Sequence, residues 1–149
     1  MAFRLERVNY DINSPNEAVR TCLQKKKQMS AAVGQGGFNG IGKESCCAYV
    51  SWGNNNRICS AIGVSRNRSL FCKSGQFSTA YIHGELDAIV QAIEENNALP
   101  HFHQIYIEMS PCPKCTAALN NLLPDNQVVY FSFDYQTERE LWAAAARRL

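Results

Sequence analysis

The fold is decided by residues 104–133, QIYIEMSPCPKCTAALNNLLPDNQVVYFSF. The segments 104–109 and 128–133 are apolar runs of strand length, and the second is continuous, as in a buried strand. Between them, apolar residues recur every three or four positions over 112–123, which indicates a helix. A strand, a helix and a second strand imply two parallel strands joined by a crossover helix.

Three more helices are predicted outward from this unit. Residues 81–97 repeat the helical spacing of apolar positions, and residues 137–148 carry acidic residues early and arginines late, which suits a helix dipole. A helix over 14–29 is predicted to begin at Ser14 as N-cap, with a capping box completed by Glu17.

Two strands, 46–52 and 58–64, flank the turn sequence Gly-Asn-Asn-Asn at 53–56 and predict a hairpin. The glycine-rich stretch 34–42 lacks the spacing of a phosphate-binding loop, and 65–79 is polar, so both are predicted to be loops. The fold class is therefore α/β, a three-layer α/β/α architecture. Its mixed sheet has four to five strands and includes an N-terminal antiparallel hairpin.

Composition and charge restrict the class of protein. The chain has 149 residues, 46% hydrophobic and 19% charged, so we expect one globular domain over 1–149. No apolar run reaches the ~20 residues of a membrane helix, and no signal-peptide core is visible, so we expect a soluble chain without a membrane partner. Seven cysteines at scattered spacing argue against a disulfide framework and favour a reducing, cytoplasmic site of action.

Two short motifs carry the chemistry: His83-Gly84-Glu85 and Pro111-Cys112-Pro113-Lys114-Cys115. Imidazole and thiolate are the ligands that zinc prefers. Each motif opens a predicted helix, and successive helix N-termini in a β-α-β unit lie along one sheet edge. His83, Cys112 and Cys115 are therefore predicted to meet around one Zn²⁺ ion.

Three protein ligands leave a fourth coordination position open, which is typical of a catalytic zinc. Glu85 follows His83 by two positions and is predicted to be the catalytic carboxylate, moving a proton between water and substrate. A structural zinc would need a fourth protein ligand, and the candidates, which are His101, His103 and the other cysteines, have no obvious spacing. A thioredoxin-like redox motif is disfavoured because Cys112-Pro113-Lys114-Cys115 follows two predicted strands and His83-Gly84-Glu85.

The pattern resembles the H-x-E…P-C-x-x-C signature of zinc nucleobase and nucleoside deaminases, the cytidine deaminase-like superfamily. The resemblance covers the chain from about residue 46 onward and implies the cytidine deaminase-like fold. It also implies hydrolytic deamination at C4 of cytosine or C6 of adenine, with Glu85 moving the proton. By the same resemblance, the Ser110 backbone would accept from the departing amino group and the Cys112 amide would orient the attacking oxygen.

Within the superfamily, the polynucleotide deaminases have a helix after the strand that corresponds to 128–133. The predicted helix over 137–148 gives the chain the same feature, so it resembles that branch. The usual strand after that helix has no sequence here. This shortened end resembles the compact deaminase domains of bacterial toxins. The resemblance implies a domain excised from a longer, secreted or delivered toxin, with an immunity protein as a partner.

Aromatic and basic residues favour a nucleic-acid substrate. Residues 1–75 carry 11 Lys+Arg against 4 Asp+Glu, whereas 76–149 carry 4 against 9. On charge alone, a solvated surface without a partner is the preferred explanation of this asymmetry. Candidate substrate-binding residues are Ser110, Asn67, Tyr81, Tyr135, Arg66 and Arg68. Further candidates for stacking are Trp52, Phe71 and Phe77, and for phosphate contact Arg57 and Lys73. Core packing is the preferred interpretation for Phe133.

The sequence thus predicts a zinc-dependent hydrolase that converts cytosine to uracil in single-stranded nucleic acid. Single-stranded DNA is the first choice, because its target base is already unpaired, and RNA is the second. The alternatives are a deaminase of free cytidine or nucleotides, a tRNA or adenosine deaminase, and an inactive zinc-binding module.

Overall fold

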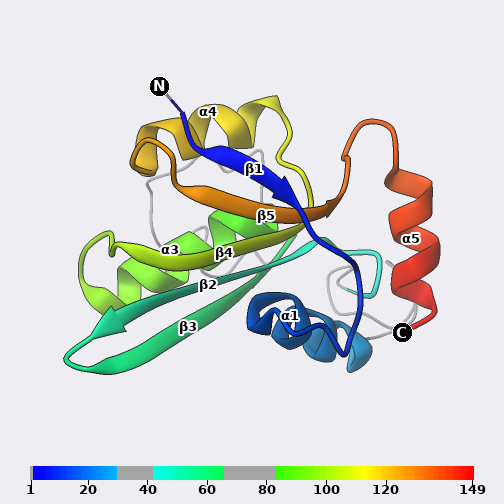
Figure 1. Ribbon diagram of the computed structural model, residues 1–149, viewed down its shortest axis with the longest axis horizontal. Coiled ribbons are helices and arrows are strands. Elements are labelled where there is room, and N and C mark those ends of the chain that lie inside the picture. The colour runs from blue at the N-terminus through cyan, green and yellow to red at the C-terminus, as the bar shows by residue number, and fades with distance from the viewer. Residues whose placement is uncertain (1, 30–41, 66–82) are drawn as a thin grey trace.

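The computed structural model describes residues 2–29, 42–65 and 83–149. These ranges contain the following strands and helices (Figure 1): β1 Arg4–Arg7, α1 Glu17–Lys27, β2 Cys47–Asn54, β3 Arg57–Val64, α3 Gly84–Asn96, β4 Phe102–Met109, α4 Pro113–Leu122, β5 Val128–Phe133 and α5 Arg139–Arg147. The predicted α/β class is confirmed. Most of the predicted loops at 34–42 and 65–79 lies outside the described residues.

The strands form one mixed sheet in the order β1-β5-β4-β2-β3. β2 pairs antiparallel with both β3 and β4, whereas β4, β5 and β1 run parallel. The crossover predicted between 104–109 and 128–133 is therefore present, with α4 as its helix. All parallel strands end at one edge of the sheet, where β2 begins and β3 ends.

The strand β1 was not predicted, although a sheet of four to five strands was. Its sequence, Arg-Leu-Glu-Arg, has no alternation of apolar and polar residues, and all four side chains are exposed. It forms because its backbone pairs with β5, with Arg4 opposite Val128 and Arg7 opposite Phe131. It occupies the sheet edge beside β5, so a segment distant in sequence provides the edge strand.

Helices cover both faces of the sheet. One core cluster joins α3 and α4 to one face, through residues such as Ile89 and Leu119, and a second joins α1 to the other, around Tyr49 and Tyr106. The helix α5 lies at the end of the sheet toward which β5 points (Figure 1). There Trp142 packs with Met109 in a third cluster, so α5 covers the end of the sheet at which the parallel strands terminate.

The predicted hairpin is confirmed, and its turn is made by Asn55 and Asn56, both at positive φ, as a two-residue type I′ turn requires. The predicted cap of α1 is wrong. Asn16, not Ser14, caps the helix, because the Asn16 side chain accepts hydrogen bonds from the Ala18 and Val19 amides. The Ser14 hydroxyl instead accepts from the amide of Asn16.

The suggestion that Trp52 stacks on a base is also wrong. Trp52 is fully buried in β2 and packs edge-on against Phe102. Strand alternation turns it toward α3 and α4, so it belongs to the core. Phe133 is half-buried and packs against the cluster of Met109 and Trp142, as its core interpretation predicted.

Candidate metal centre and substrate pocket

Three side chains with metal-binding atoms converge at the carboxyl edge of the parallel strands. The His83 Nδ1 atom lies 3.0 Å from the Cys115 Sγ atom and 3.5 Å from the Cys112 Sγ atom. Within the described ranges, these three residues form the one group whose ligand atoms all lie within 4.8 Å of one another. The predicted ligands are therefore brought together by the fold.

Both helices contribute their first residues to this cluster. His83 is the N-cap of α3 and Cys112 is the N-cap of α4, yet neither side chain makes a capping hydrogen bond. Their Nδ1 and Sγ atoms instead face the cluster. Pro113 occupies the first turn of α4, where its missing N–H is not needed, and Cys115 lies one turn further along.

Two glycines allow α3 to approach the sheet closely enough to place His83. A Cβ atom on Gly84 would lie 2.7 Å from the Cys46 carbonyl oxygen, and one on Gly63 would lie 2.0 Å from the Gly84 carbonyl oxygen. Both distances are far below van der Waals contact. Glycine is thus required where the start of α3 crosses β2 and β3, and Gly84 separates the metal ligand His83 from Glu85.

Side chains of α3 also hold the helix to the edge strand β3. The buried Asp87 carboxylate accepts a hydrogen bond from the Val64 amide at 2.9 Å. Gln91 donates to the Ile62 carbonyl at 2.7 Å. These bonds use backbone groups on the side of β3 that faces away from β2, which prevents an open sheet edge there. They also fix the orientation of the helix that carries His83.

The donor set fits zinc. Burial lowers the pKa of His83, with the Arg139 guanidinium as a second cause, so the imidazole is neutral, as a ligand must be. Burial, and next the Glu85 carboxylate, raise the pKa of the Cys115 thiol. A divalent cation between these atoms would reverse that preference, since a coordinating thiol is deprotonated. One nitrogen and two sulfurs therefore form a zinc-binding set.

Glu85 lies beside this cluster, in the first turn of α3. Its side chain is buried, and burial raises its pKa to about 7. It lines the same pocket as His83 and Cys112. A carboxyl group that titrates near neutrality can both accept and donate a proton at physiological pH.

The pocket has a volume of about 130 Å³. This is smaller than the ~300–1,000 Å³ of pockets for drug-sized ligands, so it suits a single ring. Among the described residues, its polar and charged wall includes His83, Glu85, Ser110, Tyr135, Arg139 and Glu44. Its apolar wall is formed by Met109, Trp142 and the half-buried Cys46.

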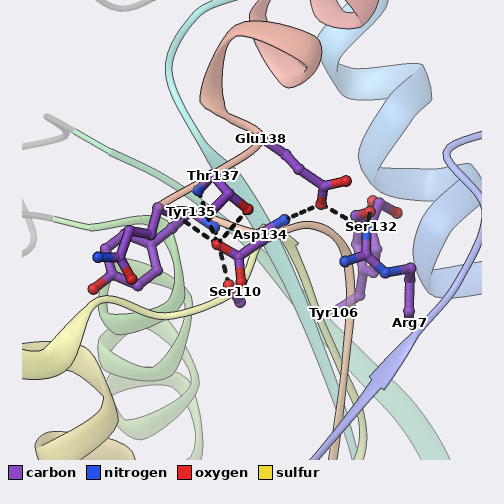
Figure 2. A network of polar contacts seen from close by, with 9 residues as sticks. Arg7, Tyr106, Ser110, Ser132, Asp134, Tyr135, Thr137 and Glu138 are labelled. Carbon is purple, nitrogen blue, oxygen red and sulfur yellow. Dashed lines mark hydrogen bonds and ion pairs between the residues drawn. The ribbon is translucent and has the colours of Figure 1, made fainter.

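Ser110 and Tyr135 lie side by side in this wall (Figure 2). The Ser110 amide donates to the Phe133 carbonyl at 2.8 Å, and its hydroxyl accepts from the Tyr135 amide at 3.0 Å. Ser110 is buried, and Tyr135 is partly exposed. Both were predicted as substrate-binding residues, and both line the pocket.

Four other predicted substrate contacts, Arg66, Asn67, Arg68 and Tyr81, lie outside the described residues, as do Phe71, Lys73 and Phe77. Arg57 is described, and it lies at the turn end of the hairpin, paired with Asn54. The opposite end of the hairpin, at Cys46 and Ser65, lines the pocket. Arg57 is therefore not part of the pocket wall.

Sequence reasoning missed Arg139 and Glu44. Arg139 is the exposed first residue of α5 and Glu44 precedes β2, where it forms an ion pair with Arg147 at 3.2 Å. A usable signal existed for Arg139: it follows β5 closely, and ligands of α/β sheets bind beyond the carboxyl ends of the strands. Glu44 offered no comparable signal, because the sequence does not predict where the segment before β2 lies relative to the pocket.

A buried ion pair joins α1 to β4 at the residue before Met109, which lines the pocket. Lys26 of α1 and Glu108 of β4 are fully buried, with Nζ and Oε1 2.9 Å apart. Lys26 also donates to the carbonyl oxygens of Lys43 and Ser45, and Glu108 accepts from the Tyr10 hydroxyl. The segment that carries Glu44 is thereby tied to the interior of the protein.

The family comparison agrees with this geometry. The profile described as the cytidine and deoxycytidylate deaminase zinc-binding region matches residues 16–132, which is 117 of the 149 residues. The chain belongs to this family. The matched region of the deaminase contains His83, Glu85, Cys112 and Cys115, so the metal ligands are those of a zinc-dependent deaminase.

Among curated proteins, a search finds no match to the deaminase. Within the described residues, no helix is long and apolar enough to cross a membrane. All six described cysteines are free, which agrees with the prediction that they form no disulfide framework.

Proposed function

We propose that this deaminase converts cytosine to uracil in single-stranded nucleic acid, with DNA preferred to RNA. The observation that carries the proposal is the pocket wall, where an aromatic residue, Tyr135, and a cation, Arg139, lie with the metal cluster and Glu85. A base can pack on the aromatic ring while its phosphate pairs with the guanidinium. Free cytidine has no phosphate for Arg139 to bind.

The chain's own residues divide the work. His83, Cys112 and Cys115 would hold the zinc, which when bound acidifies a water molecule and so supplies the nucleophile. The Glu85 carboxylate accepts the proton of that water and delivers it to the ring nitrogen beside C4. Glu85 then takes the remaining proton of the attacking oxygen and carries it to the amino group as the C4–N bond breaks, so that ammonia leaves and the oxygen stays on C4 as a carbonyl.

The remaining wall orients the base and limits water. The carbonyl of Ser110 accepts a hydrogen bond from the amino group that leaves, and the Cys112 amide donates to the attacking oxygen. Met109 and Trp142 are buried apolar neighbours of the pocket, so they exclude bulk water from the proton transfers. A pKa near 7 allows Glu85 to act as base and then as acid in one cycle.

The biological setting is part of the same proposal. Residues 1–149 would form one deaminase domain of a delivered bacterial toxin that acts in the cytoplasm of a target cell. An immunity protein would be its protein partner. Support comes from the helix α5 after β5, a feature that resembles the deaminases acting on polynucleotides. Loss of viability on cytoplasmic expression, abolished by Glu85→Gln, is the expected result.

The substrate is tested with the zinc-loaded protein in separate reactions. Single-stranded DNA, single-stranded RNA, deoxycytidylate, cytidine and adenosine-containing RNA are each incubated with enzyme, and uracil and inosine are measured by mass spectrometry. Uracil forming fastest in single-stranded DNA is expected, with Glu85→Gln as the inactive control.

Other outcomes separate the alternatives. Uracil formed only from cytidine or deoxycytidylate would make the protein a free-pool deaminase, and inosine would make it an adenosine deaminase. A zinc-loaded protein that converts none of these substrates would be a non-catalytic module. Activity on a polynucleotide should also fall steeply with salt, because phosphate contacts release counterions.

A further inference from the structure

The loop after β5, which carries Tyr135, is attached to the first strand of the chain. We infer that Arg7 of β1 is a positioning residue for the pocket: it holds Glu138, which fixes the loop 134–137 and so places Tyr135 against the substrate. The inference rests on the proposed function, in which Tyr135 contacts the base. It assigns a role to a strand whose sequence showed no pattern.

Arg7 is itself held in place by β5. Its Nη1 atom donates to the Ser132 carbonyl at 2.8 Å, and its guanidinium lies over the Phe131 ring, 5.0 Å from the centroid. The backbone on both sides is paired, since β1 runs parallel with β5 and the Val8 amide donates to the Phe131 carbonyl at 2.7 Å. The guanidinium therefore has a fixed position at the end of β5.

Glu138 connects Arg7 to the loop. One oxygen, Oε1, accepts from the Arg7 Nη1 atom at 2.7 Å and from the Asp134 amide at 2.7 Å. The loop thus closes on itself from residue 138 to residue 134, with Arg7 at the closing point. Figure 2 shows Arg7 and Tyr135 at opposite ends of this network.

Asp134 fixes the residues on the far side of Tyr135. Its Oδ1 atom accepts from the Gln136 amide at 2.9 Å, the Thr137 amide at 3.0 Å and the Thr137 hydroxyl at 3.2 Å. The Tyr135 amide donates to Ser110 at 3.0 Å. Tyr135 is therefore the centre of a loop with a hydrogen bond at every position from 134 to 137, and its side chain lines the pocket.

The ion pair itself contributes little to global stability. The Arg7 side chain is 51% exposed and that of Glu138 is 28% exposed. Exposed pairs of this kind contribute little to the stability of a fold, because water and salt screen the two charges. The expected consequence of losing Arg7 is therefore local: a looser loop and a less well-placed Tyr135, with the metal cluster unchanged.

The test compares zinc-loaded Arg7→Ala with Arg4→Ala. Arg4 lies on the same strand and is exposed, and its backbone pairs with β5 in the same manner. Arg7→Ala is expected to lower kcat/KM by about tenfold, mainly through KM, because small misplacement of a positioning group is costly. Arg4→Ala and the zinc content of both variants should stay at the wild-type level, and Arg7→Lys should recover part of the loss.

A double-mutant cycle shows whether Arg7 acts through Tyr135. In a Tyr135→Ala background, adding Arg7→Ala should cost little more, because the residue that Arg7 positions is already lost. The full tenfold loss in that background would overturn the inference. So would an Arg7→Ala enzyme whose KM equals that of wild type.

Amide hydrogen exchange provides a readout independent of activity. The amides of Asp134, Tyr135, Gln136 and Thr137 should exchange faster in Arg7→Ala than in Arg4→Ala, while those of α3 stay unchanged. If the wild-type protein deaminates no offered substrate, the proposed function fails, and amide exchange alone then tests whether Arg7 positions the loop. Equal protection of the loop in both variants would then reject a positioning role for Arg7.

Discussion

The metal cluster and the Tyr135 loop adjoin the same pocket but are built in different ways. His83, Cys112 and Cys115 all lie in the region matched by the deaminase family, and each is placed by the start of a helix. Tyr135 and its supports Arg7 and Glu138 lie on either side of that region. The loop is placed by hydrogen bonds within itself, by one to Ser110, and by the Arg7–Glu138 contact between the two ends of the chain.

We expect the metal cluster and Glu85 to determine the chemical step, and the Tyr135 loop to determine which substrate is bound. Rigid helix ends hold the ligands and Glu85, where small errors in position abolish metal binding or proton transfer. The loop depends on the partly exposed contact between Arg7 and Glu138, which is easier to alter. We expect changes in the first region to remove turnover and changes in the second to redirect or weaken it.

The largest expected effect is loss of the metal. Cys112→Ala and Cys115→Ala should each remove zinc and all measurable deamination, and should lower the melting temperature, because metal binding is coupled to folding. Removing a ligand should cost more than the ~10–100-fold in metal affinity lost with an outer-shell partner. Elemental analysis measures the zinc. Cys59→Ala, in β3, is the matched control and should keep one zinc per chain.

Glu85→Gln should retain zinc and fold but lose turnover. The amide has nearly the same shape and cannot accept the proton, so kcat should fall by ~10²–10⁴-fold with little change in KM. Zinc content and the melting temperature verify that the site is intact. A Glu85→Gln enzyme with near wild-type kcat would show that Glu85 does not transfer the proton.

Arg139→Ala tests how the pocket recognises its substrate, and in particular whether Arg139 binds a phosphate. KM should rise for single-stranded DNA and for deoxycytidylate but not for cytidine, and the slope of log affinity against log salt should become shallower by about one unit. Arg148→Ala, at the other end of α5, is the control. An equal increase in KM for cytidine would mean that Arg139 contacts the base or sugar instead of a phosphate.

The smallest expected effect concerns the titration of the loop. Backbone hydrogen bonds from Thr137 and Gln136 lower the pKa of Asp134 below 3.8, and the Asp134 amide, followed by Arg7, lowers that of Glu138 below 4.5. Since the folded values are depressed, the loop is stabilised above about pH 4.5 and loses this contribution as pH falls through the folded values.

Carboxyl carbon NMR measures these two pKa values directly. Arg7→Ala should move the pKa of Glu138 upward, toward 4.5, whereas Arg4→Ala should leave it in place. A wild-type Glu138 that titrates at 4.5 or higher would mean that the contact with Arg7 is not formed in solution. The loop that carries Tyr135 would then lack its side-chain contact with β1.

Local sequence determined most of the regular elements and the identity of the metal ligands. Helical spacing over 112–123 and the continuous apolar run over 128–133 reflect burial on one face or both, which is visible in the residue types themselves. His83, Cys112 and Cys115 were predictable because zinc restricts both ligand type and spacing.

Only the tertiary structure decided which residues surround the pocket. The strand β1 forms through backbone pairing with β5, which no side-chain pattern records, and this pairing brings Arg7 to Glu138. Trp52 and Tyr135 are both aromatic, yet one is core and the other lines the pocket, because strand alternation and loop hydrogen bonds orient them. Residue type specifies what chemistry is available, and long-range pairing specifies which of it reaches the substrate.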